Sequence, residues 1–388
     1  MTEQHQAFAD VIVNTALGVR PGEKVLVELT GVDDGLGAAV IRAVYAAGGR
    51  PFYHQMRDNL QAAWLAEADA ETIRLQAEWD TARMRAMDVY IGLRLSDNPF
   101  DQSDLPRSQT SLYRTWYEKP VHFETRLPHT RWIALAVPNA AIAQSAGMST
   151  ERFTEFYYRC CLLDYNRFAD RMKPLAQRLE RTGWVTLRGR DVNLRFCVRD
   201  MGVSVCRGNR NLPAGEVFTA PVPDSAEGMI RYNLPTEYNG RRFSGVCLEL
   251  RAGKIVSASC REGDSGALAG ILDTDEGSRR IGEFALGTNP FVTKPVHSVL
   301  FDEKASGSFH FTPGNAYSAS GKGNVSRIHW DMVYRMQPEY GGGEVWFDDV
   351  LIQKDGRFLP EDLIPLNPEL LGPEISRPTG ETGHRREK

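Results

Sequence analysis

The chain has 388 residues, of which 42% are hydrophobic and 25% are charged. These values are those of a globular protein long enough for two or three domains. The formal net charge of −4 gives no reason to expect a nucleic acid or an anionic membrane as a partner.

Apolar, strand-like runs alternate with helical stretches in the first half of the chain. Strands are predicted over residues 24–29, 51–55, 88–93 and 131–138, and helices over 35–47 and 61–83. Alternation of this kind is typical of a parallel sheet with covering helices. The sequence therefore predicts an α/β N-terminal domain.

A long helix is predicted next, over residues 150–181, because its apolar residues recur mostly at intervals of three and four. Pro174 is expected to kink it, and Gly183 is expected to end it. As a connector between domains, this helix would complete an N-terminal domain of residues 1–182.

Beyond residue 183, short alternating segments are separated by glycine and proline. Strands are predicted over 184–187, 193–198, 245–250 and 254–258. This pattern favours an antiparallel, β-rich α+β domain that spans residues 183–370. Residues 371–388 are rich in Gly, Pro and charged residues, and we predict a disordered tail there.

The segment 326–333 places His329 and Asp331 two residues apart in an apolar run. In a strand, side chains two apart project from the same face, so these two groups would point together. A buried ionisable pair is costly unless the groups are paired or hold a cation. Two readings stay open at this point: a metal site, or a His–Asp hydrogen bond that stabilises a sheet.

Three upstream segments carry further possible ligands between apolar residues or glycine. They contain Glu216, Glu283 and His310. With His329 and Asp331 they would supply two imidazoles and three carboxylates, a set that suits two ions sharing a bridging carboxylate. The mixed nitrogen and oxygen donors favour Zn, Co or Mn over Ca or Mg.

These motifs resemble those of a known family. The segments 211–221, 281–289, 309–317 and 329–331 are similar to the four metal motifs of the M29 metalloaminopeptidases, the thermophilic aminopeptidase T type. The resemblance is clear over about 200–360 and weaker over the N-terminal half. The interval of nineteen residues from His310 to His329 is shorter than in the founding enzymes, which indicates a trimmed, glycine-rich loop.

The resemblance implies a role for each matching residue. It implies that a pair of divalent metal ions is held by Glu216, Glu283, His310, His329 and Asp331. Tyr317 matches the position of a catalytic tyrosine, and packing of a loop is its structural alternative. The family also implies a homodimer that acts on short peptides.

The predicted chemistry is hydrolysis of the amino-terminal peptide bond. Two divalent ions would polarise the scissile carbonyl and lower the pKa of a shared water, so that hydroxide is available near neutral pH. A phenol such as that of Tyr317 could donate a hydrogen bond to the oxyanion that then develops.

Two other function classes remain. His310, His329 and Asp331 alone would form the triad of a mononuclear non-haem Fe(II) oxygenase. Ring-cleaving dihydroxypyridine dioxygenases are similar to the family and use such a triad, but Glu216 and Glu283 are surplus to a single iron. A non-catalytic binding protein would have no need of the five ligands.

Other polar residues stay outside the predicted site. Glu227 and Glu303 are candidates for a proton shuttle only by their proximity to the motifs, and Lys304 is undecided. The remaining histidines, His122 among them, are scattered along the chain.

A cytoplasmic location is expected from the absence of sorting signals. The polar N-terminus lacks the order of a secretory signal, and no apolar run approaches the length of a membrane span. The six cysteines show no metal-binding spacing and are expected to be reduced thiols.

Overall fold

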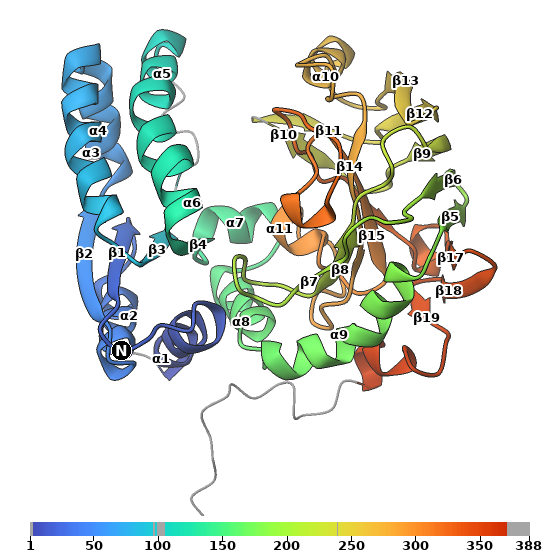
Figure 1. Ribbon diagram of the computed structural model, residues 1–388, viewed down its shortest axis with the longest axis horizontal. Helices are drawn as coiled ribbons and strands as arrows, with labels where there is room; N and C mark the ends of the chain where they lie inside the picture. The colour runs from blue at the N-terminus through green and yellow to red at the C-terminus, as the bar shows by residue number, and fades with distance from the viewer. Residues whose placement is uncertain (1–2, 96–97, 99–104, 239, 371–388) are drawn as a thin grey trace, which may run out of the picture. The chain divides into compact units, whose positions relative to one another are not determined.

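The computed structural model describes residues 3–95, 98, 105–238 and 240–370 (Figure 1). The predicted tail, 371–388, lies outside the described residues. The chain divides into two compact units. Among the described residues, the first unit contains those up to 162 together with 208–212, and the second contains 163–207 and 213–370.

A four-stranded sheet in the order β2-β1-β3-β4 forms the centre of the first unit. The strands are β1 (Lys24–Thr30), β2 (Arg50–Met56), β3 (Val89–Arg94) and β4 (Arg131–Ala136). Every neighbouring pair is parallel. The predicted α/β fold of this half is therefore confirmed, and its strands agree with the predicted ranges to within two residues.

Helices precede, connect and follow these strands. They are α1 (Glu3–Asp10), the π-helical η1 (Val11–Ala16), α2 (Asp34–Ala46), α3 (Asp58–Glu67), α4 (Ala70–Arg85), α5 (Arg107–Tyr113), the π-helical η2 (Arg114–Arg126), α6 (Leu127–His129), α7 (Ala140–Ser145) and α8 (Thr150–Cys161). The single helix predicted over 61–83 is two helices, because Asp69 caps a new helix by accepting a hydrogen bond from the backbone of Thr72. The helices α5 and η2, between β3 and β4, were not predicted.

The long helix predicted over 150–181 is also two helices. The first, α8, ends at Cys161, and α9 (Tyr165–Glu180) begins after Asp164, whose side chain accepts a hydrogen bond from the backbone of Arg167 at 3.1 Å. Pro174 lies inside α9. The two units divide between residues 162 and 163, before α9. The predicted boundary, at residue 182, lies after α9.

Antiparallel sheets dominate the second unit. An eight-stranded sheet has the order β13-β12-β9-β6-β5-β17-β18-β19, a five-stranded sheet has the order β16-β15-β14-β8-β7, and β10 pairs with β11. This arrangement confirms the predicted β-rich domain.

The strands of this unit are β5 (Trp184–Gly189), β6 (Val192–Cys197), β7 (Ser204–Cys206), β8 (Glu216–Thr219), β9 (Glu227–Arg231), β10 (Thr236–Tyr238), β11 (Arg241–Phe243), β12 (Cys247–Arg251), β13 (Lys254–Ser259), β14 (Ile281–Gly287), β15 (Ser308–Pro313), β16 (Val333–Arg335), β17 (Glu344–Phe347), β18 (Val350–Lys354) and β19 (Arg357–Phe358). Its helices besides α9 are α10 (Ser265–Leu272), α11 (Val299–Asp302) and short 3₁₀ turns at 318–320, 338–340, 364–366 and 368–370.

The two large sheets meet through aromatic side chains. The ring of Phe196 on β6 lies 5.1 Å from that of Phe284 on β14 and 4.9 Å from that of Phe311 on β15. Successive side chains in a strand point to opposite faces. The residues next to these phenylalanines, Glu283 and His310, therefore project from the other face of the five-stranded sheet.

Among the described residues, no helix combines the length and the apolar character that a membrane span requires. All six cysteines lie in the described part of the chain, and none of them forms a disulfide bond there.

Candidate metal centre

Three predicted ligands lie on three adjacent strands of the five-stranded sheet. Glu216 begins β8, Glu283 lies on β14 and His310 lies on β15 (Figure 1). The strand register places Glu216 opposite Gly287 and His310 opposite Ala285. Because residues 283, 285 and 287 share a face of β14, the three ligands project from the same side of the sheet.

A small residue at position 287 lets another segment approach this face. A Cβ atom added to Gly287 would lie 2.3 Å from the carbonyl oxygen of Ala305 and 2.9 Å from that of Glu303. Both atoms belong to the backbone, so any side chain at this position would push the segment 303–305 away from the sheet. Gly287 thus allows Glu303 and Lys304 to reach the ligands.

The segment that carries His329 and Asp331 is extended, but β16 begins only at Val333. A continuous strand over 326–333 does not form, because the backbone N–H groups of Ser326 and Arg327 donate to side chains instead of to a neighbouring strand. The side chains of His329 and Asp331 nevertheless point together, as predicted. His329 Nε2 lies 3.2 Å from Asp331 Oδ1.

The structure brings all five predicted ligands together around Glu283. Glu283 Oε1 lies 3.0 Å from His310 Nε2, and Glu283 Oε2 lies 3.9 Å from His329 Nε2. Glu216 Oε2 lies 3.7 Å from the same nitrogen of His310. A single buried carboxylate therefore spans the two imidazoles, with Glu216 on one side and Asp331 on the other.

Hydrogen bonds orient the side chains of His329 and Asp331. The backbone carbonyl of Asn315 lies 2.8 Å from His329 Nδ1, so this nitrogen donates and Nε2 is left to face the carboxylates. Thr312 Oγ1 donates to Asp331 Oδ1 at 2.7 Å. Partners of this kind fix the ring orientation of metal-binding histidines and the position of their carboxylate neighbours.

Glu303 and Lys304 join this cluster, although the sequence analysis left both outside the site. Lys304 Nζ contacts Glu303 Oε1 at 2.7 Å and also donates to Glu216 Oε1. The one feature of the sequence that could have indicated their role is the charged triplet 302–304 between apolar and small residues. Glu227, the other candidate, is exposed and accepts a hydrogen bond from the backbone of Ala252.

The charge of the cluster fits bound cations. Four carboxylates, those of Glu216, Glu283, Glu303 and Asp331, face one lysine, and the three glutamates are at most 6% exposed. Burying this much negative charge is costly without cations. Two glutamate oxygens, Glu216 Oε2 and Glu283 Oε2, are buried with no hydrogen-bond partner among the described residues.

The pKa values show the same excess of negative charge. Burial by itself lowers the pKa of His329, but the hydrogen bond and charge of Asp331 outweigh it and raise the pKa to about 10. For His310, burial is likewise outweighed, by the hydrogen bond to Glu283 and the charge of Glu216, and its pKa rises to about 9. In the absence of a cation, the cluster therefore binds protons.

The ligand atoms form two compact groups. One comprises Glu216, Glu283 and His310, and the other comprises Glu303, His310 and Asp331; within each group the atoms lie within 4.8 Å of one another. Oxygen and imidazole nitrogen donors of this kind suit divalent transition metals. The residues present thus fit divalent ions, although the second group includes Glu303, which was not predicted, and lacks the predicted ligand His329.

Tyr317 lies at the edge of the cluster. Its ring centroid is 4.9 Å from that of His329 and 5.7 Å from that of Phe218, and half of the residue is exposed. Partial burial and then the charge of Glu283 raise the pKa of the phenol above its ordinary value of 10. The hydroxyl therefore stays protonated at neutral pH and can donate a hydrogen bond.

Asp275 fixes the segment that leads to His329. It accepts hydrogen bonds from Ser278 Oγ at 2.9 Å, Ser326 Oγ at 2.8 Å and the backbone N–H of Arg327 at 2.7 Å. Burial alone would raise the pKa of Asp275, but these hydrogen bonds lower it from 3.8 to about 2. This stabilisation is present above pH 4 and is lost as the pH falls from about 4 to 2.

Asp275→Asn is therefore expected to reduce the free energy of unfolding by about 1–2 kcal/mol at pH 7, because charge-assisted hydrogen bonds are lost. Urea unfolding of the metal-free protein at pH 7, 4 and 3 measures the difference from wild type, which should shrink as the pH falls. A difference that stays constant with pH would show that the carboxylate charge of Asp275 is not its source.

Comparison with known proteins gives the family. The sequence profile described as "Thermophilic metalloprotease (M29)" matches residues 1–358. The chain belongs to the M29 family. M29 membership confirms the resemblance inferred from the four motifs and identifies the chain as a metal-dependent aminopeptidase, a hydrolase.

Individual M29 relatives extend over both units. Aminopeptidase 2 of Geobacillus stearothermophilus is 24% identical over 352 residues, which cover 80% of this chain and 83% of the relative. The structure of wild-type AmpT from Thermus thermophilus matches with a TM-score of 0.74 at 20% identity and covers 92% of this chain and 99% of that chain.

The same fold occurs in a protein with a different chemistry. The 2,5-dihydroxypyridine dioxygenase of Pseudomonas putida KT2440 matches with a TM-score of 0.59 at 14% identity and covers 94% of this chain and all of that chain. At such identities a structural match shows the fold alone, because one fold can carry several reactions. The side chains of the site, and not the fold, therefore determine the reaction.

Proposed function

We propose that this M29 protein is a two-metal aminopeptidase that hydrolyses the amino-terminal peptide bond of short peptides. The observation that supports this most is the position of Glu283, whose two oxygens face the imidazoles of His310 and His329. A carboxylate that faces two separate imidazoles is suited to bridge two ions. A single iron held by His310, His329 and Asp331 would not need Glu216 or Glu283 as a ligand.

Each ion is assigned a set of residues. Glu216, Glu283 and His310 would hold one divalent ion, and His329 and Asp331, with the second oxygen of Glu283, would hold the other. Zn, Co or Mn suits these donors. Ions at such sites polarise a carbonyl and lower the pKa of a bound water.

The remaining residues act on the substrate and on protons. Tyr317 would donate a hydrogen bond to the oxyanion that develops on the carbonyl oxygen of the scissile bond. Glu303 is assigned to neither ion and lies close to His310 and Asp331. It would take a proton from the attacking water and return it to the leaving amine. Lys304 would hold Glu303 in place.

We further propose that the protein acts in the cytoplasm as a homodimer. The family resemblance of the motifs supports the dimer, which would enclose a cavity and limit substrates to short or unfolded peptides. Light scattering of the purified chain tests it, since a monomeric mass would remove the enclosed cavity.

Metal content and substrate choice test the reaction together. After reconstitution, elemental analysis is expected to give close to two Zn, Co or Mn ions per chain. The loaded enzyme should cleave aminoacyl anilides with a free amine and leave the matched N-acetylated anilides intact. One iron per chain, with turnover of a dihydroxylated aromatic ring under air, would instead support the dioxygenase.

A further inference from the structure

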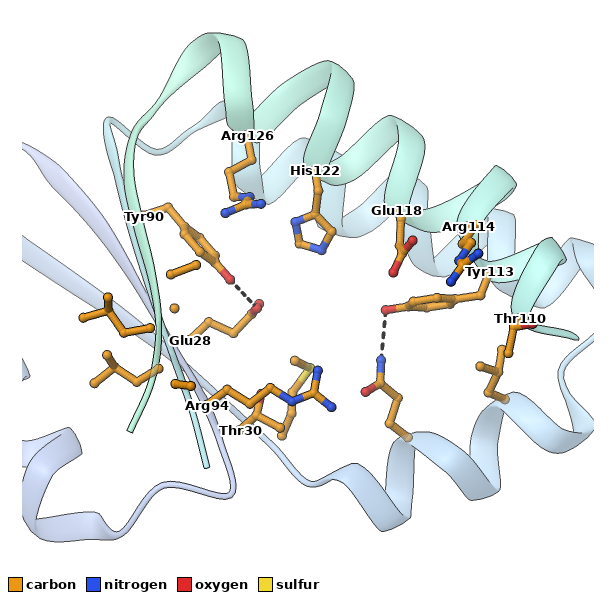
Figure 2. A pocket seen from close by; sticks show the side chains of 18 residues that line it. Glu28, Thr30, Tyr90, Arg94, Thr110, Tyr113, Arg114, Glu118, His122 and Arg126 are labelled. Carbon is orange, nitrogen blue, oxygen red and sulfur yellow. Dashed lines mark hydrogen bonds between the residues drawn. The ribbon is translucent and has the colours of Figure 1, made fainter. Parts of the chain in front are cut away.

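The first unit contains a polar cavity, and none of its lining residues belongs to the metal centre. It has a volume of about 470 Å³ and lies at the carboxyl ends of the parallel strands β1, β3 and β4 (Figure 2). Ligands of open α/β sheets bind in crevices at this end of the strands. The volume lies within the range of small-molecule sites.

One face of η2 forms a wall of this cavity. Arg114, Glu118, His122 and Arg126 recur at intervals of four, and all four line it. Figure 2 shows their side chains pointing into the same space as Glu28 and Arg94 from the sheet. The wall therefore presents charged and hydrogen-bonding groups in a row.

Two nitrogen atoms on this wall have no hydrogen-bond partner. Arg126 Nε and His122 Nδ1 are buried and unpaired among the described residues. The guanidinium of Arg126 instead lies 4.9 Å from the ring centroids of both Tyr90 and Trp132. The rings hold the cation in place and leave its N–H donors unused.

The carboxylates of the cavity are not paired with Arg126, although the charge of Glu28 favours its charged form. Within the described parts of the chain, no carboxylate forms an ion pair with it. Glu28 accepts a hydrogen bond from Tyr90 at 2.6 Å and faces His54 at 3.5 Å. Burial accordingly lowers the pKa of Arg126, although an arginine remains charged near neutral pH. A half-buried cation with unused donors is suited to an anion.

We propose that this cavity binds a small molecule through an oxyanion, a carboxylate or a phosphate, that lies between Arg126 and His122. Arg126 supplies the charge and His122 a second N–H donor from the adjacent turn of the same helix. Glu118, one turn farther along, would accept a hydrogen bond from an ammonium or hydroxyl group of the same ligand. The site lies wholly within the first unit and does not depend on the metal centre.

Isothermal titration calorimetry of the metal-loaded full chain tests the proposal. Inorganic phosphate probes a phosphate ligand, and β-alanine probes a ligand with a carboxylate and an ammonium group. Arg126→Met keeps a long unbranched side chain beside the two rings and removes the donors. Arg74→Met is the matched control, because Arg74 also lies over a ring, that of Trp116, but is exposed and outside the cavity.

The expected result is that at least one probe binds wild type and Arg74→Met equally and binds Arg126→Met about tenfold or more weakly. The probe that shows this dependence identifies the anion. Binding at the metal centre would be the same in all three proteins. If Arg126→Met is unfolded by circular dichroism, His122→Phe, which keeps a flat ring beside Tyr117, takes its place. Equal binding by wild type and the folded variant, or no binding of either probe, would overturn the proposal.

Discussion

Glu283→Gln is expected to abolish peptide hydrolysis, with a loss in turnover of about a thousandfold or more. The amide matches the carboxylate in shape but carries no charge and cannot offer two anionic oxygens to two ions. Metal affinity should fall by more than the roughly 10- to 100-fold that is typical when a residue supporting a ligand is lost. Elemental analysis after dialysis and an aminoacyl anilide assay measure the two effects.

Stability distinguishes this loss from misfolding. The Glu283 carboxylate is buried, and burial raises its pKa. Glutamine removes one of four clustered carboxylate charges and can still accept a hydrogen bond from His310, so the metal-free protein should stay about as stable as wild type. Added metal at about a hundred times its Kd should stabilise wild type by about 2.7 kcal/mol and Glu283→Gln far less.

Glu227→Gln, at an exposed carboxylate, is the control and should keep full activity. Wild-type metal content and rate in Glu283→Gln would rule out the bridging role.

Tyr317→Phe is expected to lower kcat by about 10²- to 10³-fold, equivalent to about 2.7–4 kcal/mol, if its hydroxyl donates to the developing oxyanion. The ring contacts with Phe218 and His329 would remain, so metal content and thermal stability should be unchanged. A donor that acts mainly on the transition state affects kcat more than KM. Steady-state kinetics on one anilide substrate, with metal content measured on the same sample, separates these effects.

Tyr340→Phe is the control for Tyr317→Phe. It removes a phenol hydroxyl from a 3₁₀ turn of the same unit, where the ring lies 5.3 Å from the guanidinium of Arg335. Its activity should equal that of wild type. A wild-type rate in Tyr317→Phe would instead assign Tyr317 to packing of the loop beside His329.

The sequence by itself determined the class of both halves and the residues that meet at the metal centre. Periodicity of two and of about 3.6 residues is a local property, so the strands β1 to β4 and the antiparallel character of the second half could be predicted. The five proposed ligands could be predicted because they lie in four short motifs, and the two-residue spacing of His329 and Asp331 requires only an extended backbone.

Helix ends depended on single capping side chains. The apolar pattern continues through residues 61–83 and 150–181, but Asp69 and Asp164 accept hydrogen bonds from the backbone and start new helices there. Capping of this kind does not change the apolar periodicity. The division of the chain after residue 162 lies between the two helices that replace the predicted single helix.

Only the tertiary structure decided which other charged residues join a site. Glu303 and Lys304 reach the ligands because Gly287, on another strand, leaves room for their backbone. Arg126 and His122 face a cavity because η2 lies across the ends of strands that are remote in sequence. Both arrangements depend on close approach between distant segments. Local periodicity and spacing carry no information about that approach, since it is fixed by packing of the whole unit.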